Sequence, residues 1–174
     1  MTELYERNLK LNASAAKMAV KFDDNGAFYH NRFGMLPVDF VVEITSHYIF
    51  VEVKDPEGAR DMPNVQRAKF REDVNTEQFN QKCYRKYRDS YLYLHFAGSL
   101  NEKPIICVLL LCAPWVDQVL RSNKSEQISK QIPTHANCPA GWTHAVMETF
   151  LVLSIEEWNK FLPRLPIERV SEGV

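Results

Sequence analysis

The sequence predicts an α/β fold in which helices flank a central mixed sheet. Three observations carry this prediction. Two apolar runs between residues 38 and 54 alternate with polar positions, residues 105–112 are almost continuously apolar, and apolar residues recur at helical spacing around them. Alternation is typical of a strand with two different faces, whereas a continuous apolar run is typical of a strand buried on both faces. A chain of 174 residues fits one domain, over residues 1–174.

The N-terminal segment is predicted to be a helix from Thr2 to about Lys21. Thr2 is a suitable N-cap, and two glutamates, Glu3 and Glu6, lie in the first turn, where the helix dipole favours acidic side chains. The apolar residues at helical spacing are Leu4, Leu11, Ala15 and Met18.

Residues 38–44 and 49–54 predict two strands of a β-hairpin. If the turn contains two or four residues, Asp39 lies opposite Glu52, with about 5 Å between their Cβ atoms. Two carboxylates at that distance repel each other, so a cation between them is expected. Lys54 shares the face of Glu52, and the cluster suits Mg²⁺, which binds one or two carboxylates together with water and phosphate oxygens.

The remaining elements follow from turn signals and periodicity. Residues 55–71 are rich in turn formers and predict a loop beside the hairpin, and a helix is expected from about Val74 to Gly98. The strand at 105–112 is expected to pair in parallel with the Glu52 strand after this crossover. The later predicted elements are a helix at 115–130, a strand at 146–153 and a helix at 155–161, capped by Ser154 with Glu157.

The sequence Pro37-Val38-Asp39, followed by Glu52-Val53-Lys54, resembles the signature of the PD-(D/E)XK nuclease superfamily. In that superfamily the aspartate starts the second core strand, and the E-x-K triplet lies on the third. Here Val38 separates Pro37 from Asp39, which is a departure from the motif. The departure is minor, because only the aspartate and the E-x-K triplet take part in catalysis in that superfamily. The resemblance covers residues 3–112 and assigns no subfamily. It implies a restriction-endonuclease-like α/β sandwich.

The resemblance also implies roles for these residues. Asp39, Glu52 and the main-chain carbonyl of Val53 would bind Mg²⁺ or Mn²⁺. Lys54 would position or deprotonate the attacking water and offset negative charge on the phosphate. The alternative is that Glu52 and Lys54 are ordinary residues of a solvent-facing strand and that Asp39 merely starts its strand.

Further site residues are implied outside the hairpin. The family often adds a carboxylate from the first helix, for which Glu6 is the candidate and Glu3 the alternative. Substrate-contacting residues on the helix that follows the E-x-K strand would be Gln81, Lys82 and Arg85. The competing interpretation is that these three form the solvated face of a soluble helix.

The predicted function is therefore a metal-dependent nuclease that hydrolyses phosphodiester bonds, with DNA as the expected partner. The alternative is a catalytically inert protein of the same fold that serves as a binding subunit for nucleic acid or protein. The net charge of −1 means that any basic surface must be local, and a homodimer, as in many relatives, would concentrate two such surfaces.

Composition sets the cellular expectation. No apolar segment is long enough for a membrane span, and the polar N-terminus does not resemble a secretory signal, so we expect a cytoplasmic protein without a membrane partner. His135, Cys138 and His144 form a loose cluster with no fourth ligand at the usual spacing, which makes a zinc site the disfavoured interpretation.

Overall fold

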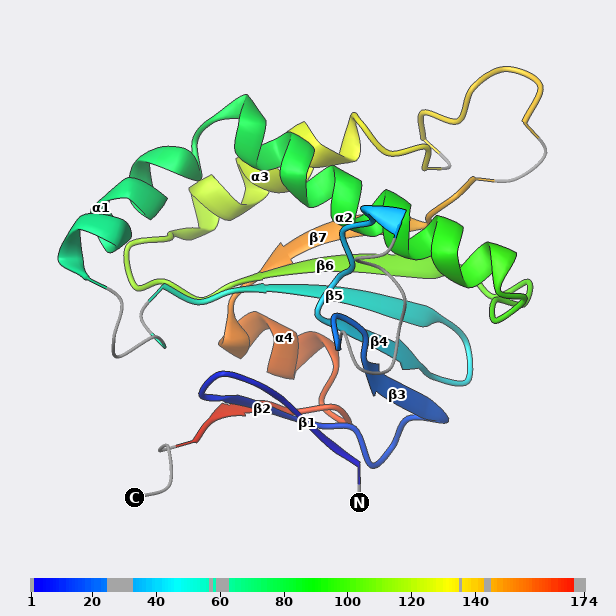
Figure 1. Cartoon of the computed structure of the whole chain (residues 1–174), viewed down its shortest axis with the longest axis horizontal. Helices are drawn as coiled ribbons and strands as arrows, with labels where there is room; N and C mark the ends of the chain where they lie inside the picture. The colour runs from blue at the N-terminus through cyan, green and yellow to red at the C-terminus, as the bar shows by residue number, and fades with distance from the viewer. Residues whose placement is uncertain are drawn as a thin grey trace.

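A large mixed sheet forms the centre of the protein. The computed structural model describes residues 2–24, 33–56, 58, 63–134, 136–142 and 145–170. The strand order is β3-β4-β5-β6-β7, with β3 to β5 antiparallel and β5 to β7 parallel, as Figure 1 shows. The predicted mixed sheet is thus confirmed. The strands are β3 Met18–Lys21, β4 Phe40–Glu43, β5 Tyr48–Lys54, β6 Ile105–Leu111 and β7 Thr149–Leu153.

A small antiparallel sheet occupies the place of the predicted first helix. It consists of β1 Glu3–Glu6, β2 Leu9–Asn12 and β8 Ile167–Arg169, in the order β1-β2-β8. The helix prediction for residues 2–21 is therefore wrong. Its error has a physical reason, because Leu9 and Leu11 are buried at every second position of β2, which is the period of a strand.

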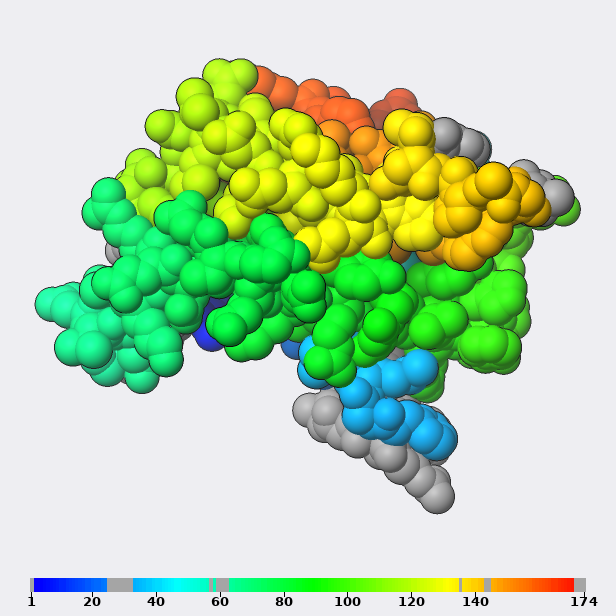
Figure 2. All heavy atoms as spheres, turned by 90° about the horizontal axis from the view of Figure 1, so that it is seen from above, coloured from blue at the N-terminus to red at the C-terminus, as the bar shows by residue number. Residues whose placement is uncertain are grey.

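Two helices, α2 Glu77–Phe96 and α3 Gln118–Ser129, cover one face of the large sheet (Figures 1 and 2). A third, α1 Asn64–Asp73, lies on the same side beyond the ends of the strands, where Phe70 contacts Phe79 and Trp115. The opposite face is covered by α4 Ile155–Phe161 and the small sheet. Part of the loop predicted at 55–71 is thus helical, and α1 was missed because none of its residues is buried, so it has no apolar stripe. Within the described residues, no helix is long and apolar enough to cross a membrane.

Alternating side chains divide the core into two layers. Val41 and Phe50 point toward α2 and α3, whereas Val42 and Ile49 point toward α4 and the small sheet. Every residue of β6 is buried, as expected for a strand with a layer on each face. The parallel pairing of β5 with β6 confirms the crossover predicted from the sequence.

Local signals at the helix ends hold α2 and α4 in place. Thr76 caps α2 by accepting a hydrogen bond from Phe79 N–H, and Gly98, with a φ of +66°, follows its last turn. Ser154 and Glu157 form the predicted capping box at the start of α4. The cap and the buried face of α2 fix which of its side chains reach the sheet.

Candidate metal centre and cleft

The β4–β5 hairpin brings two buried carboxylates together. Its ladder pairs Phe40 with Val51, and one further step places Asp39 opposite Glu52, as predicted. Asp39 is 5% exposed, and Glu52 is fully buried. The backbone N–H of Val53 donates a hydrogen bond of 2.6 Å to Asp39 Oδ2, which fixes the orientation of this carboxylate.

Two lysines neutralise Glu52. Lys54 pairs with it from the same strand, and Lys86 Nζ on α2 lies 2.8 Å from it and 3.9 Å from Asp39 Oδ1. Burial acts to lower the pKa of Lys54, but the adjacent Glu52 carboxylate outweighs it and raises that pKa overall. Lys54 therefore carries a full positive charge at neutral pH, which suits charge stabilisation rather than proton abstraction.

Asp39 lacks comparable neutralisation. Burial and then the negative charge of Glu52 raise its pKa to about 7, against the opposing effects of Lys86, Lys54 and the Val53 N–H. Near neutral pH, Asp39 therefore exists in both protonation states. A further cation beside it would favour the charged form.

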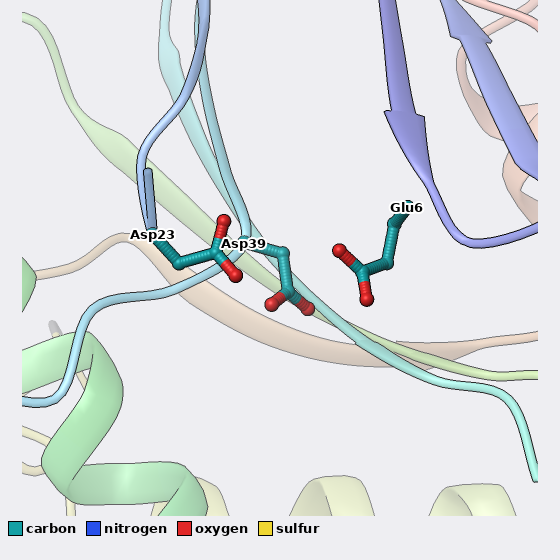
Figure 3. A group of neighbouring side chains, drawn as sticks. All are labelled: Glu6, Asp23 and Asp39. Atoms are coloured by element: carbon teal, nitrogen blue, oxygen red, sulfur yellow. The ribbon is translucent and has the colours of Figure 1, made fainter. Parts of the chain in front are cut away.

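Two more carboxylates gather around Asp39. They are Glu6, at the end of β1, and Asp23, which follows β3 (Figure 3). One carboxylate oxygen from each of Glu6, Asp23 and Asp39 lies within 4.8 Å of the other two. Lys21 Nζ pairs with Glu6 and lies 2.6 Å from Asp23 Oδ1. Glu6 is thus brought to the predicted site by a strand instead of a helix, whereas Asp23 was not predicted.

The donor set fits a hard divalent cation. Lys54 C=O accepts a hydrogen bond from Cys112 N–H on the β6 side, so the preceding carbonyl, that of Val53, points to the β4 side, where Asp39 lies. Three carboxylates and this carbonyl provide oxygen ligands only, which Mg²⁺ and Mn²⁺ prefer. Of the predicted ligands, Asp39 and Val53 belong to this set, whereas Glu52 lies in the adjacent lysine cluster.

An open cleft of about 290 Å³ gives access to this centre. In Figure 2, deep-blue atoms of the N-terminal segment are visible between α1 and α2. The lining contains three acidic and three basic side chains, so the charge of a bound divalent cation would make the cleft net positive. The lining residues are Glu6, Arg7, Asp39, Val53, Lys54, Asp55, Pro56, Phe70 and Lys86.

The predicted substrate-contacting residues lie outside this cleft. Gln81, Lys82 and Arg85 are exposed on α2, and none of them lines the cleft. Lys86 reaches it instead. The signal for Lys86 was present in the sequence, because it follows Cys83 by three positions and so lies on the buried face of the helix.

The two candidates for the additional carboxylate lie at opposite ends of β1. Glu6 lines the cleft, whereas Glu3 pairs with Lys10 on β2, 3.6 Å away. Of the loose cysteine–histidine cluster, His135 and His144 lie outside the described residues. Of the two glutamates, Glu6 is therefore the one that lies at the candidate site.

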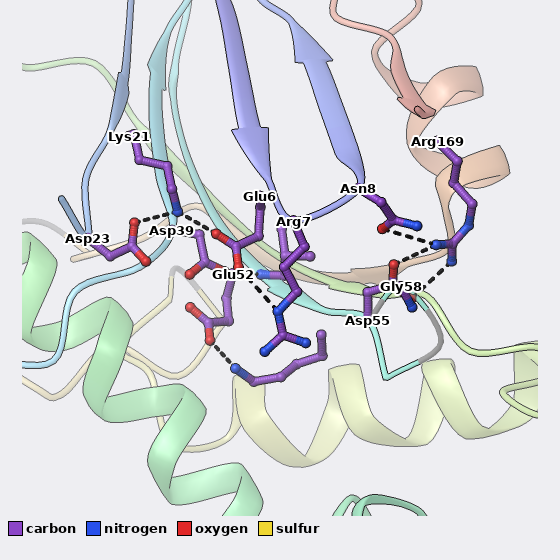
Figure 4. A network of polar contacts seen from close by, with 12 residues as sticks. Glu6, Arg7, Asn8, Lys21, Asp23, Asp39, Glu52, Asp55, Gly58 and Arg169 are labelled. Carbon is purple, nitrogen blue, oxygen red and sulfur yellow. Dashed lines mark hydrogen bonds and ion pairs between the residues drawn. The ribbon is translucent and has the colours of Figure 1, made fainter. Parts of the chain in front are cut away.

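A second polar cluster holds the end of β5 against the small sheet (Figure 4). Arg169 of β8 donates two hydrogen bonds, of 2.6 and 3.0 Å, to buried Asp55, the residue after Lys54. Asn8 accepts a further bond from Arg169. A Cβ at Gly58 would collide with the side chains of Asp55 and Asn8, so a larger residue there would displace this cluster. The cluster fixes the β1–β2 turn relative to the cleft.

Comparison with known protein families, with curated proteins and with solved structures found no match.

The Glu52→Gln variant is expected to lose about 2 kcal/mol of unfolding free energy, because it leaves Lys54 and Lys86 beside a buried neutral amide. Breaking a fully buried pair costs more, but both lysine side chains are partly exposed and can turn toward water. Urea denaturation measures the loss. Glu156→Gln, in an exposed pair with Lys160, is the control and should change little. An equally small change in Glu52→Gln would contradict the prediction.

Proposed function

We propose that this protein is a metal-dependent nuclease that hydrolyses phosphodiester bonds of nucleic acid, with DNA as the first substrate to test. The observation that carries the proposal is the opposed pair of Asp39 and Glu52, with Lys54 beside it, at the edge of an open cleft. The order of elements supports a restriction-endonuclease-like sandwich, because the β4–β5 hairpin is followed by α2 and then by β6, parallel to β5.

Asp39, Glu6, Asp23 and the Val53 carbonyl would hold Mg²⁺ or Mn²⁺. When bound, such an ion offsets charge on the phosphate and makes a bound water more acidic. Asp39 is oriented for this role by the Val53 N–H. Lys54 supplies a fixed positive charge at the cleft, which stabilises the negative charge that develops on the phosphate during hydrolysis.

The second candidate is a binding subunit that keeps this fold without turnover. One observation favours it. Internal ammonium groups already neutralise the carboxylates around Asp39, with Lys54 and Lys86 on Glu52 and Lys21 on Glu6 and Asp23. With these pairs formed and Asp39 partly protonated, the cluster needs no metal ion to offset its charge.

Cleavage of a substrate panel separates the two candidates. Plasmid, linear duplex, single-stranded DNA and RNA are incubated with the protein in Mg²⁺, in Mn²⁺ or in EDTA. The nuclease proposal expects cleavage of at least one substrate with metal and none in EDTA, and Lys54→Ala, purified in parallel, excludes a contaminating enzyme. Cleavage of no substrate, together with no shift of the melting temperature by either metal, would support the binding subunit.

The Glu6→Gln variant is expected to bind Mn²⁺ about tenfold more weakly than the wild type, because it removes one of three charged oxygen ligands. Isothermal titration calorimetry measures the dissociation constant. Glu3→Gln is the matched control, since Glu3 lies on the same strand but at its other end. Equal affinities in the wild type and Glu6→Gln would remove Glu6 from the metal centre.

A further inference from the structure

The turn between β1 and β2 contains an unfavourable backbone conformation. Glu6 pairs with Leu9, so Arg7 and Asn8 form a two-residue turn. Arg7 has a φ of +52°, and it is the only non-glycine residue with a positive φ in the described ranges. A positive φ at the first central residue alone is the type II′ arrangement, in which this position is ordinarily glycine. Arginine thus occupies a position where glycine would relieve backbone strain.

The Arg7 side chain extends from this turn into the cleft (Figure 4). It lines the cleft and is 49% exposed. Its Nε lies 3.9 Å from Glu6 Oε1, and within the described part of the chain its guanidinium donates no hydrogen bond. The planar fork of donors is therefore available, and this geometry matches the oxygens of a phosphate.

The base of the turn is rigid. Asn8, the neighbour of Arg7, contacts Arg169, which is held by two hydrogen bonds to Asp55. Asp55 directly follows Lys54 on β5, so the turn is fixed relative to the strand that carries the centre. The backbone that carries Arg7 is therefore fixed, and binding a ligand orders only the side chain of Arg7.

We propose that Arg7 binds a backbone phosphate of a nucleic-acid strand at the mouth of the cleft. The inference rests on the proposed function and adds to it a residue for substrate binding that no sequence pattern indicated. Arg7 holds the strand so that a neighbouring phosphate reaches Asp39 and Lys54. Its backbone strain is consistent with this role, because glycine would suit the turn better but would bind no phosphate.

The test measures binding without cleavage. Fluorescence anisotropy of a labelled single-stranded DNA oligonucleotide in EDTA gives the dissociation constant at several salt concentrations. Arg7→Gly is expected to bind about tenfold more weakly, as for the loss of one charge-assisted contact. The slope of log K against log salt should fall by about 0.7, as for one phosphate on a single strand. Because glycine relaxes the turn, its melting temperature should equal or exceed that of the wild type.

Two further variants sharpen the test. Arg7→Lys keeps the positive charge but loses the planar pair of donors of the guanidinium. Its affinity for the oligonucleotide should lie between those of the wild type and Arg7→Gly. Lys160→Ala removes one exposed cation on α4 and should bind as the wild type does. Unchanged affinity and salt slope in Arg7→Gly would overturn the inference even if the wild type cleaves DNA, and so would a wild type that binds no oligonucleotide. Binding that depends on Arg7 in a protein that cleaves nothing would keep the inference and reject the nuclease.

Discussion

The Asp39→Asn variant is expected to lose metal-dependent cleavage by about 10³-fold while remaining folded. Asparagine has nearly the same shape, and its carbonyl oxygen can accept the hydrogen bond from Val53 N–H. The substitution removes only the charge, which is the property that a divalent cation requires. Losing electrostatic stabilisation of this kind typically costs 10² to 10³ in rate, or about 3 to 4 kcal/mol of barrier.

Two measurements separate a chemical effect from a folding effect. The variant should melt at least as high as the wild type in EDTA, because a buried charge with a raised pKa has been removed. Added Mn²⁺ should raise the melting temperature of the wild type only. Asp117→Asn is the control, since Asp117 caps α3, where asparagine serves equally well, and lines no part of the cleft. Wild-type cleavage by Asp39→Asn would remove Asp39 from the centre.

The hairpin and its opposed carboxylates could be predicted because their signals are local. Asp39 and Glu52 belong to two alternating runs joined by a short turn, so the register follows from the period of the strands. The buried strand β6 and the capping box at Ser154 are equally local. In each case neighbouring residues in the sequence contain the whole signal.

The small sheet could not be predicted in this way. β8 has only three residues, and it pairs with Leu9–Leu11 of β2, which lies near the other end of the chain. No local sequence pattern therefore predicts this pairing. Glu6 and Asp23 meet Asp39 only because β1 and β3 end at the same edge of the protein. The four ligands come from β1, from the residues next to β3 and β4, and from β5, so the composition of the centre depends on contacts between segments that are far apart in the sequence.

The contribution of Asp39 to the unfolding free energy of the metal-free protein is expected to decrease as pH rises from about 4 to about 7. Asp39 has a pKa near 7 in the folded protein, against an ordinary value of 3.8. Within this window the folded state holds a proton that the unfolded state has released, so unfolding becomes easier as pH increases. The slope for one proton is about 1.4 kcal/mol per pH unit, which amounts to about 4 kcal/mol across the window.

Comparison with Asp39→Asn isolates this contribution from that of the other carboxylates. Burial acts to raise the pKa of Glu157, but hydrogen bonds from Ser154 and Arg121 lower it overall, so Glu157 acts in the opposite direction at low pH and contributes equally to both proteins. The unfolding free energy of the wild type minus that of the variant should therefore fall between pH 4 and 7 in EDTA and level off above it. With saturating Mn²⁺ the fall should disappear or reverse, because the ion displaces the proton from Asp39. A difference that is constant with pH in EDTA would mean that Asp39 is already ionised at pH 4. Burial would then not raise the pKa of Asp39, and a bound cation would have no proton to displace from it.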